Sequence, residues 1–341
     1  MAGPIRVAVD ALGGDRGPEE IVAGALEARS ATIEPVLFGP AGLDARGLEL
    51  VETTQEIAMD EKPADAVRGK PDSSLVAACR AVHEGDAQAA VSAGNTGAML
   101  AAGLVYIRRL RGVLRPAIAV VVPTPKGPSV LIDSGANADC RAEHLLQFAV
   151  MGSVFAEEIL EISQPTVGLL SIGEEPEKGD QLTLEAHRLL AASELNFRGN
   201  VESRWLLAHV ADVVVCDGFT GNVVLKLLEG TIRTTLDWLR SEITATARGK
   251  AGGLLIKPAA ARLRAHLDPD TYGGAYLLGL RGLAVIAHGN SSRGAIANAI
   301  RLAARGIDHD VVRRLGERMA QESGEERVSI RALSESNPQE R

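Results

Sequence analysis

Short apolar runs alternate along this chain with longer stretches rich in alanine and leucine, and this alternation most limits the folds it can adopt. Several runs are almost continuously apolar, which is typical of strands covered by helices on both faces. Strands that alternate with helices indicate βαβ units. We therefore expect an α/β fold with a largely parallel sheet.

The expected elements extend over most of the chain. The strands are Ile5–Val9, Glu34–Phe38, Gln88–Ser92, Ala117–Val122, Val130–Ile132, Val167–Ile172, Val210–Cys216 and Ala284–Ala287. The helices are Glu19–Ser30, Ser74–Glu84, Ala98–Leu110, Ala142–Glu161, Leu182–Ser193, Asn222–Thr246 and Arg293–Ala304. We expect a single catalytic domain over residues 1–320 with a protruding helical segment near residues 240–270. The polar residues 321–341 predict a flexible tail.

Composition argues against several classes of protein. A net charge of -8 gives no basic surface for a nucleic acid, so no nucleic-acid partner is expected. The amino-terminal segment shows no signal-peptide pattern, and no apolar run is long enough to span a bilayer, so we expect a cytoplasmic protein. Cys79, Cys140 and Cys216 lie far apart, which fits a reducing compartment. Cys216 could act as a nucleophile, but a buried strand thiol is the favoured interpretation.

Six of the expected strands end in a loop that combines glycine with small polar or charged residues. Ligands of open α/β sheets bind at the carboxyl ends of strands. One such loop would indicate only a tight turn. Because six of them would converge on one edge of the sheet, we predict a ligand site there. The loops are residues 10–15, 92–97, 133–139, 173–179, 217–222 and 288–292.

Two of these loops have the features of an anion site. Each lies between a strand and the start of a helix, where glycine lets backbone N–H groups approach an anion and the helix dipole adds positive charge. The candidate residues for phosphate and substrate are Gly94, Asn95, Thr96, Asp217, Gly218 and Thr220. The chain contains no Walker A motif, no GxGxxG fingerprint, no GxSxG elbow and no HExxH pair.

Single polar residues in the loops leave alternatives open. Lys178 either binds phosphate or pairs with Glu174 or Glu175, and His288 either donates to a substrate oxygen or has a structural role. Asn222 is a natural N-cap whose amide could instead polarise a carbonyl. The loop aspartates Asp10, Asp15, Asp133, Asp139 and Asp217 could bind a metal, but capping and loop-fixing roles are favoured, so no metal is expected.

Phosphate chemistry fits this set of residues better than covalent catalysis does. A phosphate dianion is itself a competent nucleophile, so a site that binds it requires no catalytic serine or cysteine. It requires that the phosphate and the acyl substrate are held in position and that hydrogen-bond donors point at the developing oxyanion.

As a set, the loops resemble the bacterial phosphate acyltransferase family of phospholipid synthesis, which acts on acyl-acyl carrier protein. Single segments are weak evidence, but their order over about nine tenths of the chain is specific. Departures at Arg16, Ser171 and Tyr276 concern loop shape and acyl-chain fit. The matching segments are residues 8–15, 59–75, 91–98, 132–139, 167–179, 197–202, 211–226 and 272–280.

The resemblance implies a three-layer α/β/α fold like that of phosphate acetyltransferase and isocitrate dehydrogenase. It implies fatty acyl transfer from acyl carrier protein to inorganic phosphate, with Lys178 engaging phosphate and Asn222 stabilising the reacting carbonyl. It also implies a homodimer, no metal or organic cofactor, and peripheral contact with the membrane and with the downstream acyltransferase. The alternatives are a phosphate acetyl- or butyryltransferase using coenzyme A, a decarboxylating dehydrogenase, and a membrane-bound scaffold without activity.

The segment over residues 249–267 is the most basic stretch of an acidic chain. Leu255, Ala259, Leu263 and Leu267 recur every four residues and predict an apolar helix stripe. Either this helix forms a dimer interface, or Leu254, Leu255 and Ile256 at a turn tip dip into an anionic bilayer. The cations that would meet headgroups or an acidic carrier protein are Lys257, Arg262 and Arg264.

Overall fold

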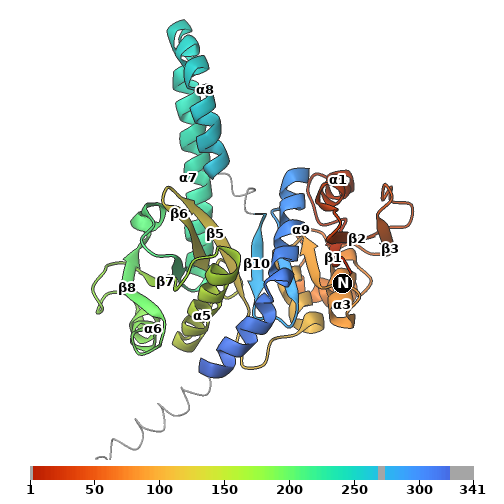
Figure 1. Ribbon diagram of the computed structural model, residues 1–341, viewed down its shortest axis with the longest axis horizontal. Helices are drawn as coiled ribbons and strands as arrows, with labels where there is room; N and C mark the ends of the chain where they lie inside the picture. Colours follow the sequence, from red (N-terminus) through yellow and green to blue (C-terminus); the bar gives the residue numbers. More distant parts are fainter. Residues whose placement is uncertain (1–2, 268–272, 323–341) are drawn as a thin grey trace, which may run out of the picture.

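One sheet of eleven strands crosses the part of the molecule that the structure describes (Figure 1). The computed structural model describes residues 3–267 and 273–322. The strands are β1 Ile5–Asp10, β2 Ile33–Gly39, β3 Glu49–Glu52, β4 Ala89–Ser92, β5 Ala117–Thr124, β6 Gly127–Ile132, β7 Thr166–Ser171, β8 Asn196–Glu202, β9 Val213–Val215, β10 Ala275–Leu278 and β11 Leu283–Ile286. Their order across the sheet is β3-β2-β1-β4-β11-β10-β5-β6-β9-β7-β8.

Helices cover both faces of the sheet, which confirms the three-layer α/β/α expectation. The α-helices are α1 Pro18–Ala28, α2 Pro63–Gly69, α3 Ser74–Glu84, α4 Thr96–Ala102, α5 Ala142–Ile159, α6 Gln181–Ala191, α7 Gly218–Thr244, α8 Ala247–Leu267 and α9 Arg293–Asp308. A π-helix follows α4 over Gly103–Ile107, and a 3₁₀ helix spans Ser203–Ala208. Residues 311–322 form a further helix, so only residues 321–322 of the predicted tail lie within the described part.

Two strands in the middle divide the sheet into halves of opposite direction. The pairings β11–β10, β10–β5 and β5–β6 are antiparallel, and the other pairings in the described part of the chain are parallel. Strands β1 to β4 and β11 therefore run one way, whereas β6 to β9 run the other way. The expectation that six loops converge on one edge of the sheet is thus wrong, since the carboxyl ends of the two halves point in opposite directions.

The strand register nevertheless brings loops of both halves together near the middle of the sheet. Ser92 at the end of β4 pairs with Ile286, which pairs with Ala275 of β10. The next residue of β10 pairs with Ala119 of β5, which pairs with Ile132 at the end of β6. Strands β4 and β6 thus end within about one residue of the same row across the sheet. Their loops face each other there, although the strands arrive from opposite sides.

Helix α5 packs into the core and is buried around most of its circumference. A helix that is apolar all round is typical of a protein interior. The Phe155 ring meets the Tyr276 ring edge to face at 5.1 Å between centroids, so α5 is anchored to the antiparallel strand β10. The central strands that carry the site loops are therefore held against a well-packed layer.

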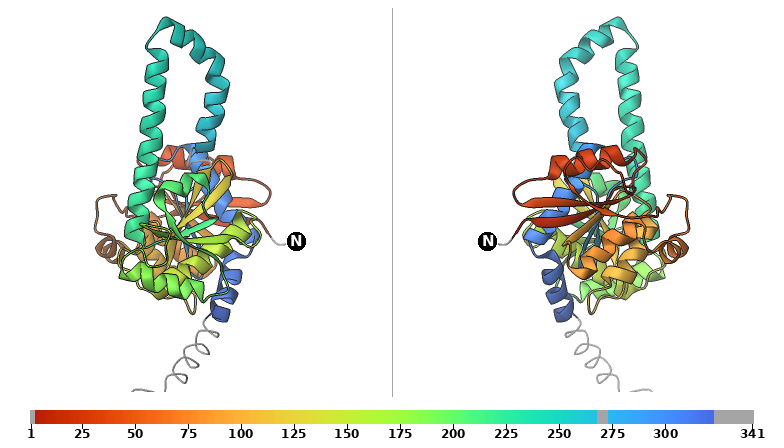
Figure 2. Two further views of the ribbon diagram at one scale, coloured as in Figure 1. Left: turned by 90° about the vertical axis from the view of Figure 1, so that its left-hand side faces the viewer. Right: turned by 90° about the vertical axis from the view of Figure 1, so that its right-hand side faces the viewer.

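Helices α7 and α8 form a hairpin that projects beyond the rest of the molecule (Figure 2). The turn lies at residues 245–246, because Thr246 caps α8 by accepting a hydrogen bond from Gly249 N at 3.0 Å. Gly249 is needed there, since a Cβ atom would lie 2.1 Å from the Ile243 carbonyl oxygen. The placement of Leu254–Ile256 at a turn tip was therefore wrong, and these residues lie within α8.

Candidate functional site

A cavity of about 460 Å³ opens where the loops of the two halves meet. Gly94 and Thr96 reach it from the loop after β4, Asn222 from the start of α7, and His288 from the loop after β11. Ser134 and Gly135 line the cavity from the loop after β6, which is the predicted site loop at residues 133–139. The structure thus brings four of the predicted site residues together.

Asn222 presents an unengaged amide to this cavity. The side chain is exposed and has no hydrogen-bond partner in the described part of the chain. Gly135, whose φ is +137°, lies beneath it, and a Cβ atom there would lie 3.7 Å from the Asn222 Cβ atom. Glycine at position 135 therefore leaves the face of Asn222 open to a substrate.

Asp217, and not Asn222, is the N-cap of α7. The Asp217 carboxylate accepts hydrogen bonds from Thr220 N at 2.9 Å and from the Thr220 hydroxyl at 2.6 Å. The N-cap interpretation of Asn222 is thus wrong, because α7 begins four residues earlier than predicted, at Gly218. Gly218 N donates to the Asn137 carbonyl, so this N–H group is already satisfied. Asp217, Gly218 and Thr220 therefore shape the helix start that carries Asn222.

Asn95 holds the loop after β4 in place. Its side-chain oxygen accepts from Ala98 N at 3.0 Å, and its amide nitrogen donates to the carbonyl groups of residues 58, 59 and 61. Gly94 N donates to the Ser92 hydroxyl, which donates in turn to Asp10 at 2.6 Å. Only Thr96 of this loop has an exposed side chain without a partner among residues 3–267 and 273–322.

Buried aspartates fix the loops from behind. Asp133 accepts backbone hydrogen bonds from Ile118, Gly135, Ala136 and Asn137, which wraps its loop around one carboxylate. Burial raises the pKa of this carboxyl group, although these hydrogen bonds oppose the shift. The loop-fixing interpretation of Asp133 is therefore confirmed. No cluster of metal-ligating side chains occurs in the described ranges.

Lys178 lies outside the lining of the cavity, in the exposed loop after β7. It forms no salt bridge with Glu174 or Glu175 within the residues that the structure describes. Strand β7 pairs in parallel with β9 through Leu169 and Val215, so their following loops leave the sheet side by side. Because β9 leads directly into α7, the loop of Lys178 neighbours the helix start that carries Asn222.

Lys226 is a cation at the site that the sequence analysis missed. It lines the cavity one helical turn after Asn222 and approaches Glu229 at 3.1 Å. Glu229 also lies 3.4 Å from His288 Nε2, so one carboxylate sits between two basic groups. The spacing of four residues from Asn222 was the available signal, because such residues share a helix face.

None of the three cysteines is an activated nucleophile. Burial raises the pKa of Cys216 well above its ordinary value, and Asp217 and Asp133 add to this effect. Burial likewise raises the pKa of Cys79 to about 12 and that of Cys140 to about 11. Reactive cysteines have a lowered pKa. Cys216 is buried as expected, and it lies directly after β9.

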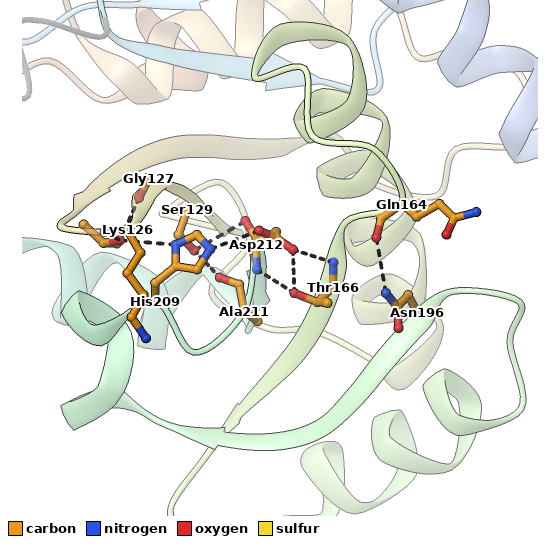
Figure 3. Close-up of polar contacts among 10 residues, drawn as sticks. Lys126, Gly127, Ser129, Gln164, Thr166, Asn196, His209, Ala211 and Asp212 are labelled. Carbon is orange, nitrogen blue, oxygen red and sulfur yellow. Dashed lines mark hydrogen bonds and ion pairs between the residues drawn. The ribbon is translucent and has the colours of Figure 1, made fainter.

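A second polar cluster lies at the opposite ends of β7 and β9 (Figure 3). Asp212 accepts from Thr166 N at 2.8 Å and from the Thr166 hydroxyl at 2.6 Å, and its other oxygen is 3.1 Å from His209 Nε2. Thr124, on the far side of His209, donates its hydroxyl to the Gly127 carbonyl. This Asp–His–Thr array thus ties strands together, and its hydroxyl is not free to attack a substrate.

The α7–α8 hairpin exposes both apolar and basic side chains. Leu254, Leu255 and Ile256 are 72%, 84% and 47% exposed. On α7, Phe219, Val223, Leu227 and Trp238 are exposed as well. The exposed lysine and arginine residues of α8 are Arg248, Lys250, Lys257, Arg262 and Arg264. No helix in the described ranges is both long and apolar enough to cross a membrane.

Comparison with known sequences finds relatives that match this chain over most of its length. A family model described as "Fatty acid synthesis protein" matches residues 5–314. A phosphate acyltransferase of Desulfitobacterium hafniense is 49% identical over 310 residues, which is 88% of this chain and 93% of the relative. A phosphate acyltransferase of Heliobacterium modesticaldum is 46% identical over 321 residues, which is 90% and 96% of the two chains.

Solved structures show the same fold at low sequence identity. A phosphotransacetylase from Streptococcus pyogenes matches with a TM-score of 0.58 and 18% identity over 89% of this chain and 94% of that one. A 4-hydroxythreonine-4-phosphate dehydrogenase from Klebsiella pneumoniae matches with a TM-score of 0.50 and 14% identity over 89% and 98%. The expected likeness to the phosphate acetyltransferase fold is confirmed.

Proposed function

Because this chain belongs to the phosphate acyltransferase family of fatty acid and phospholipid synthesis, we propose that it transfers a fatty acyl group from acyl carrier protein to inorganic phosphate. The observation that carries this proposal is the cavity at Asn222, with a free amide and no activated nucleophile beside it. A site of this kind suits attack by bound phosphate on a thioester.

The reaction is a direct displacement. A phosphate oxygen attacks the thioester carbonyl carbon, the new C–O bond forms, and the C–S bond breaks. The carrier protein leaves as a thiolate and takes up a proton from solvent. Asn222 Nδ2 donates a hydrogen bond to the carbonyl oxygen as negative charge develops on it, which stabilises the transition state more than the ground state.

Phosphate is engaged by Lys178. Its ammonium group has no carboxylate partner in the described part of the chain, and its loop neighbours the start of α7 across the β7–β9 pair. The long, flexible lysine side chain can reach from this loop to the cavity and place its positive charge beside phosphate. Thr96 and His288 contact substrate oxygens from the other half of the cavity. Gly94, Asn95, Asp217, Gly218 and Thr220 hold the loops that position these groups.

A second copy of this chain covers α7. Phe219, Val223 and Leu227 recur every four residues on one face of the helix and are 66%, 51% and 69% exposed. A large exposed apolar stripe marks an interaction surface. We assign this stripe to a homodimer interface, which leaves the far part of the hairpin for other partners.

The outer part of α8 contacts an anionic membrane through Leu254, Leu255 and Ile256, and the acidic carrier protein docks on Lys257, Arg262 and Arg264. The enzyme is thus cytoplasmic with peripheral membrane contact, close to the acyltransferase that consumes acyl phosphate. The chemistry requires no metal and no organic cofactor.

One assay tests the substrate assignment. The protein is incubated with palmitoyl-acyl carrier protein or palmitoyl-coenzyme A, each with and without phosphate, and acyl phosphate is measured as its hydroxamate. We expect phosphate-dependent product mainly from the carrier-protein thioester. A clear preference for the coenzyme A thioester would instead establish the coenzyme A alternative.

A further inference from the structure

A second, larger cavity of about 650 Å³ continues from the first one along α7. Val120, Leu225, Lys226 and His288 line both cavities, so the two spaces are adjacent and share a wall. The cavity with the free amide of Asn222 therefore opens into a groove that leads toward the base of the hairpin.

The groove side of α7 has a regular pattern. Leu225, Leu228, Ile232 and Leu236 follow one another at spacings of three and four residues and form an apolar row. Leu225 is buried, and the other three are half-buried. A parallel row of charged side chains forms the rim, and it consists of Glu229, Arg233 and Asp237.

Strand β5 supplies the facing wall. Val120 and Val122 are two residues apart on an extended strand, so their side chains lie on the same face, and Pro123 continues the wall. These two facing walls of the groove are thus apolar, and the charged side chains of Arg16, Lys226 and Arg264 line other parts of the cavity. A polar occupant would leave its own donors and acceptors unsatisfied against these walls.

We infer that this groove holds the fatty acyl chain of the thioester substrate, an inference that rests on the proposed reaction at Asn222. The acyl carbonyl must lie within reach of the Asn222 amide, and its hydrocarbon tail must continue from there. Leu225 to Leu236 span eleven residues of helix, or about 16 Å, which matches about a dozen extended methylene groups. The amide-rich arm of a carrier protein fits these walls poorly.

The position of each apolar residue along α7 then sets which chain lengths are accepted. One helical turn corresponds to about four methylene groups. Measured along the helix from Asn222, Ile232 lies about 15 Å away and Leu236 about 21 Å away. Ile232 therefore contacts the outer part of a palmitoyl chain, beyond the end of an octanoyl chain, and Leu236 lies near the palmitoyl end. A bulky side chain at position 232 should exclude long chains and spare those that end before it.

The test compares acyl phosphate formation from octanoyl- and palmitoyl-acyl carrier protein by Ile232→Trp. The ratio of the palmitoyl rate to the octanoyl rate is measured, because a ratio is independent of the fraction of protein that folds. We expect it to fall at least tenfold, since each methylene kept out of an apolar site loses favourable transfer from water. Leu236→Trp should lower the ratio less. Thr231→Trp, an exposed position of α7 outside the groove, should leave it unchanged.

An unchanged ratio in Ile232→Trp would overturn the inference, as would an equal fall in Thr231→Trp. If Ile232→Trp lowered turnover of the octanoyl and palmitoyl substrates by the same factor, the groove would instead hold the arm of the carrier protein to which the acyl chain is attached. A second readout does not need turnover. A palmitoyl thioester with a photoreactive group at its ω end should crosslink to residues 228–237 of the wild-type protein without phosphate. Wild-type protein that crosslinks but makes no acyl phosphate would sink the proposed reaction and leave the groove in place.

Discussion

At the scale of single residues, the site depends on neighbouring residues at the start of α7 that have different roles: some cap the helix, and another is left free to meet the substrate. Asp217 caps α7, and its carboxylate accepts hydrogen bonds from the backbone and the hydroxyl of Thr220. The Asn222 side chain therefore takes no part in capping the helix. Gly135 beneath it leaves space that a side chain would fill. A preorganised donor without a competing partner is what an oxyanion site requires.

Asn222→Ala should lower turnover by about 10²–10³-fold, because it removes one donor to the developing oxyanion. The protein should stay folded, since the Asn222 side chain has no hydrogen-bond partner in the described residues. Steady-state rates with palmitoyl-acyl carrier protein, together with a thermal unfolding curve, measure both effects. Near-normal turnover would remove the Asn222 amide from the mechanism.

Lys178→Ala should raise the Michaelis constant for phosphate by about tenfold or more, while the constant for the acyl thioester changes little. The change removes the point charge that we propose engages phosphate, and it leaves the cavity wall intact. Lys226→Ala is the matched control, because Lys226 lines the cavity but already meets Glu229. If only Lys226→Ala raises the Michaelis constant for phosphate, then Lys226 of α7 binds phosphate and Lys178 of the loop after β7 does not.

Residue types predicted some of these roles better than others. The loops, the cavity-lining residues Thr96, Asn222 and His288, and the inert cysteines followed from the sequence. The role of Asn95 did not, because its three carbonyl acceptors come from residues 58–61, far away along the chain. The N-cap of α7 was misplaced since Asp217 and Asn222 are both good capping residues, and only tertiary packing decides between them.

At the scale of elements, long helices and buried strands were predictable and short or exposed strands were not. Strand β10 is only four residues long, Ala275–Leu278, which is too short to show a hydrophobic periodicity in the sequence. It is recognised as a strand by its antiparallel pairing with β11 and β5. Strand β3 is mostly exposed, so no buried face marks it. Short strands gain their stability from pairing, which the local sequence does not record.

The polar cluster at Asp212 should contribute pH-dependent stability. Burial raises the Asp212 pKa, but the hydrogen bonds from Thr166 and His209 outweigh it and hold the pKa below its ordinary value. A carboxyl group with a lowered pKa stabilises the fold above its unfolded pKa and loses that effect as the pH falls. Asp212→Ala should thus cost about 1–3 kcal/mol at pH 7, and this cost should shrink as the pH falls from about 4 through the lower pKa of the folded protein.

Urea unfolding of both proteins across this pH range measures the difference. Glu177→Ala, which removes an exposed carboxylate, is the control and should show little effect at any pH. A difference for Asp212→Ala that does not change with pH would mean that packing, and not the carboxylate, stabilises the cluster.

The hairpin prediction concerns Leu254, Leu255 and Ile256. Changing all three to serine should weaken binding to anionic liposomes at least several-fold, because it removes the exposed apolar side chains that we propose enter the bilayer. Turnover in solution should remain close to normal, since these residues are far along α8 from the cavity. Co-sedimentation with phosphatidylglycerol vesicles measures the binding.

Two further variants separate the surfaces of the hairpin. Leu114→Ser changes an exposed leucine outside the hairpin and should leave vesicle binding intact. Changing Arg262 and Arg264 to glutamate should raise the Michaelis constant for acyl carrier protein, more strongly at low salt. Loss of the dimer in the triple serine variant, with vesicle binding unchanged, would assign Leu254–Ile256 to the subunit interface.

At the scale of the whole molecule, the central fact is that two half-sheets of opposite direction face each other across β10 and β5. Periodicity predicts that a segment is a strand, but it contains no information on which way neighbouring strands run. The sequence therefore located the loops of the site but could not show that they come from opposite sides. This arrangement gives the cavity two walls, with Thr96 and His288 on one side and Asn222 on the other.

The most direct test of the account is a single turnover with enzyme in excess over palmitoyl-acyl carrier protein. Without phosphate we expect no release of carrier-protein thiol and no acylated enzyme in the mass spectrum. Addition of phosphate should release thiol and acyl phosphate in equal amounts. Thiol released before phosphate is added, together with an acyl group on the protein, would contradict direct attack by phosphate.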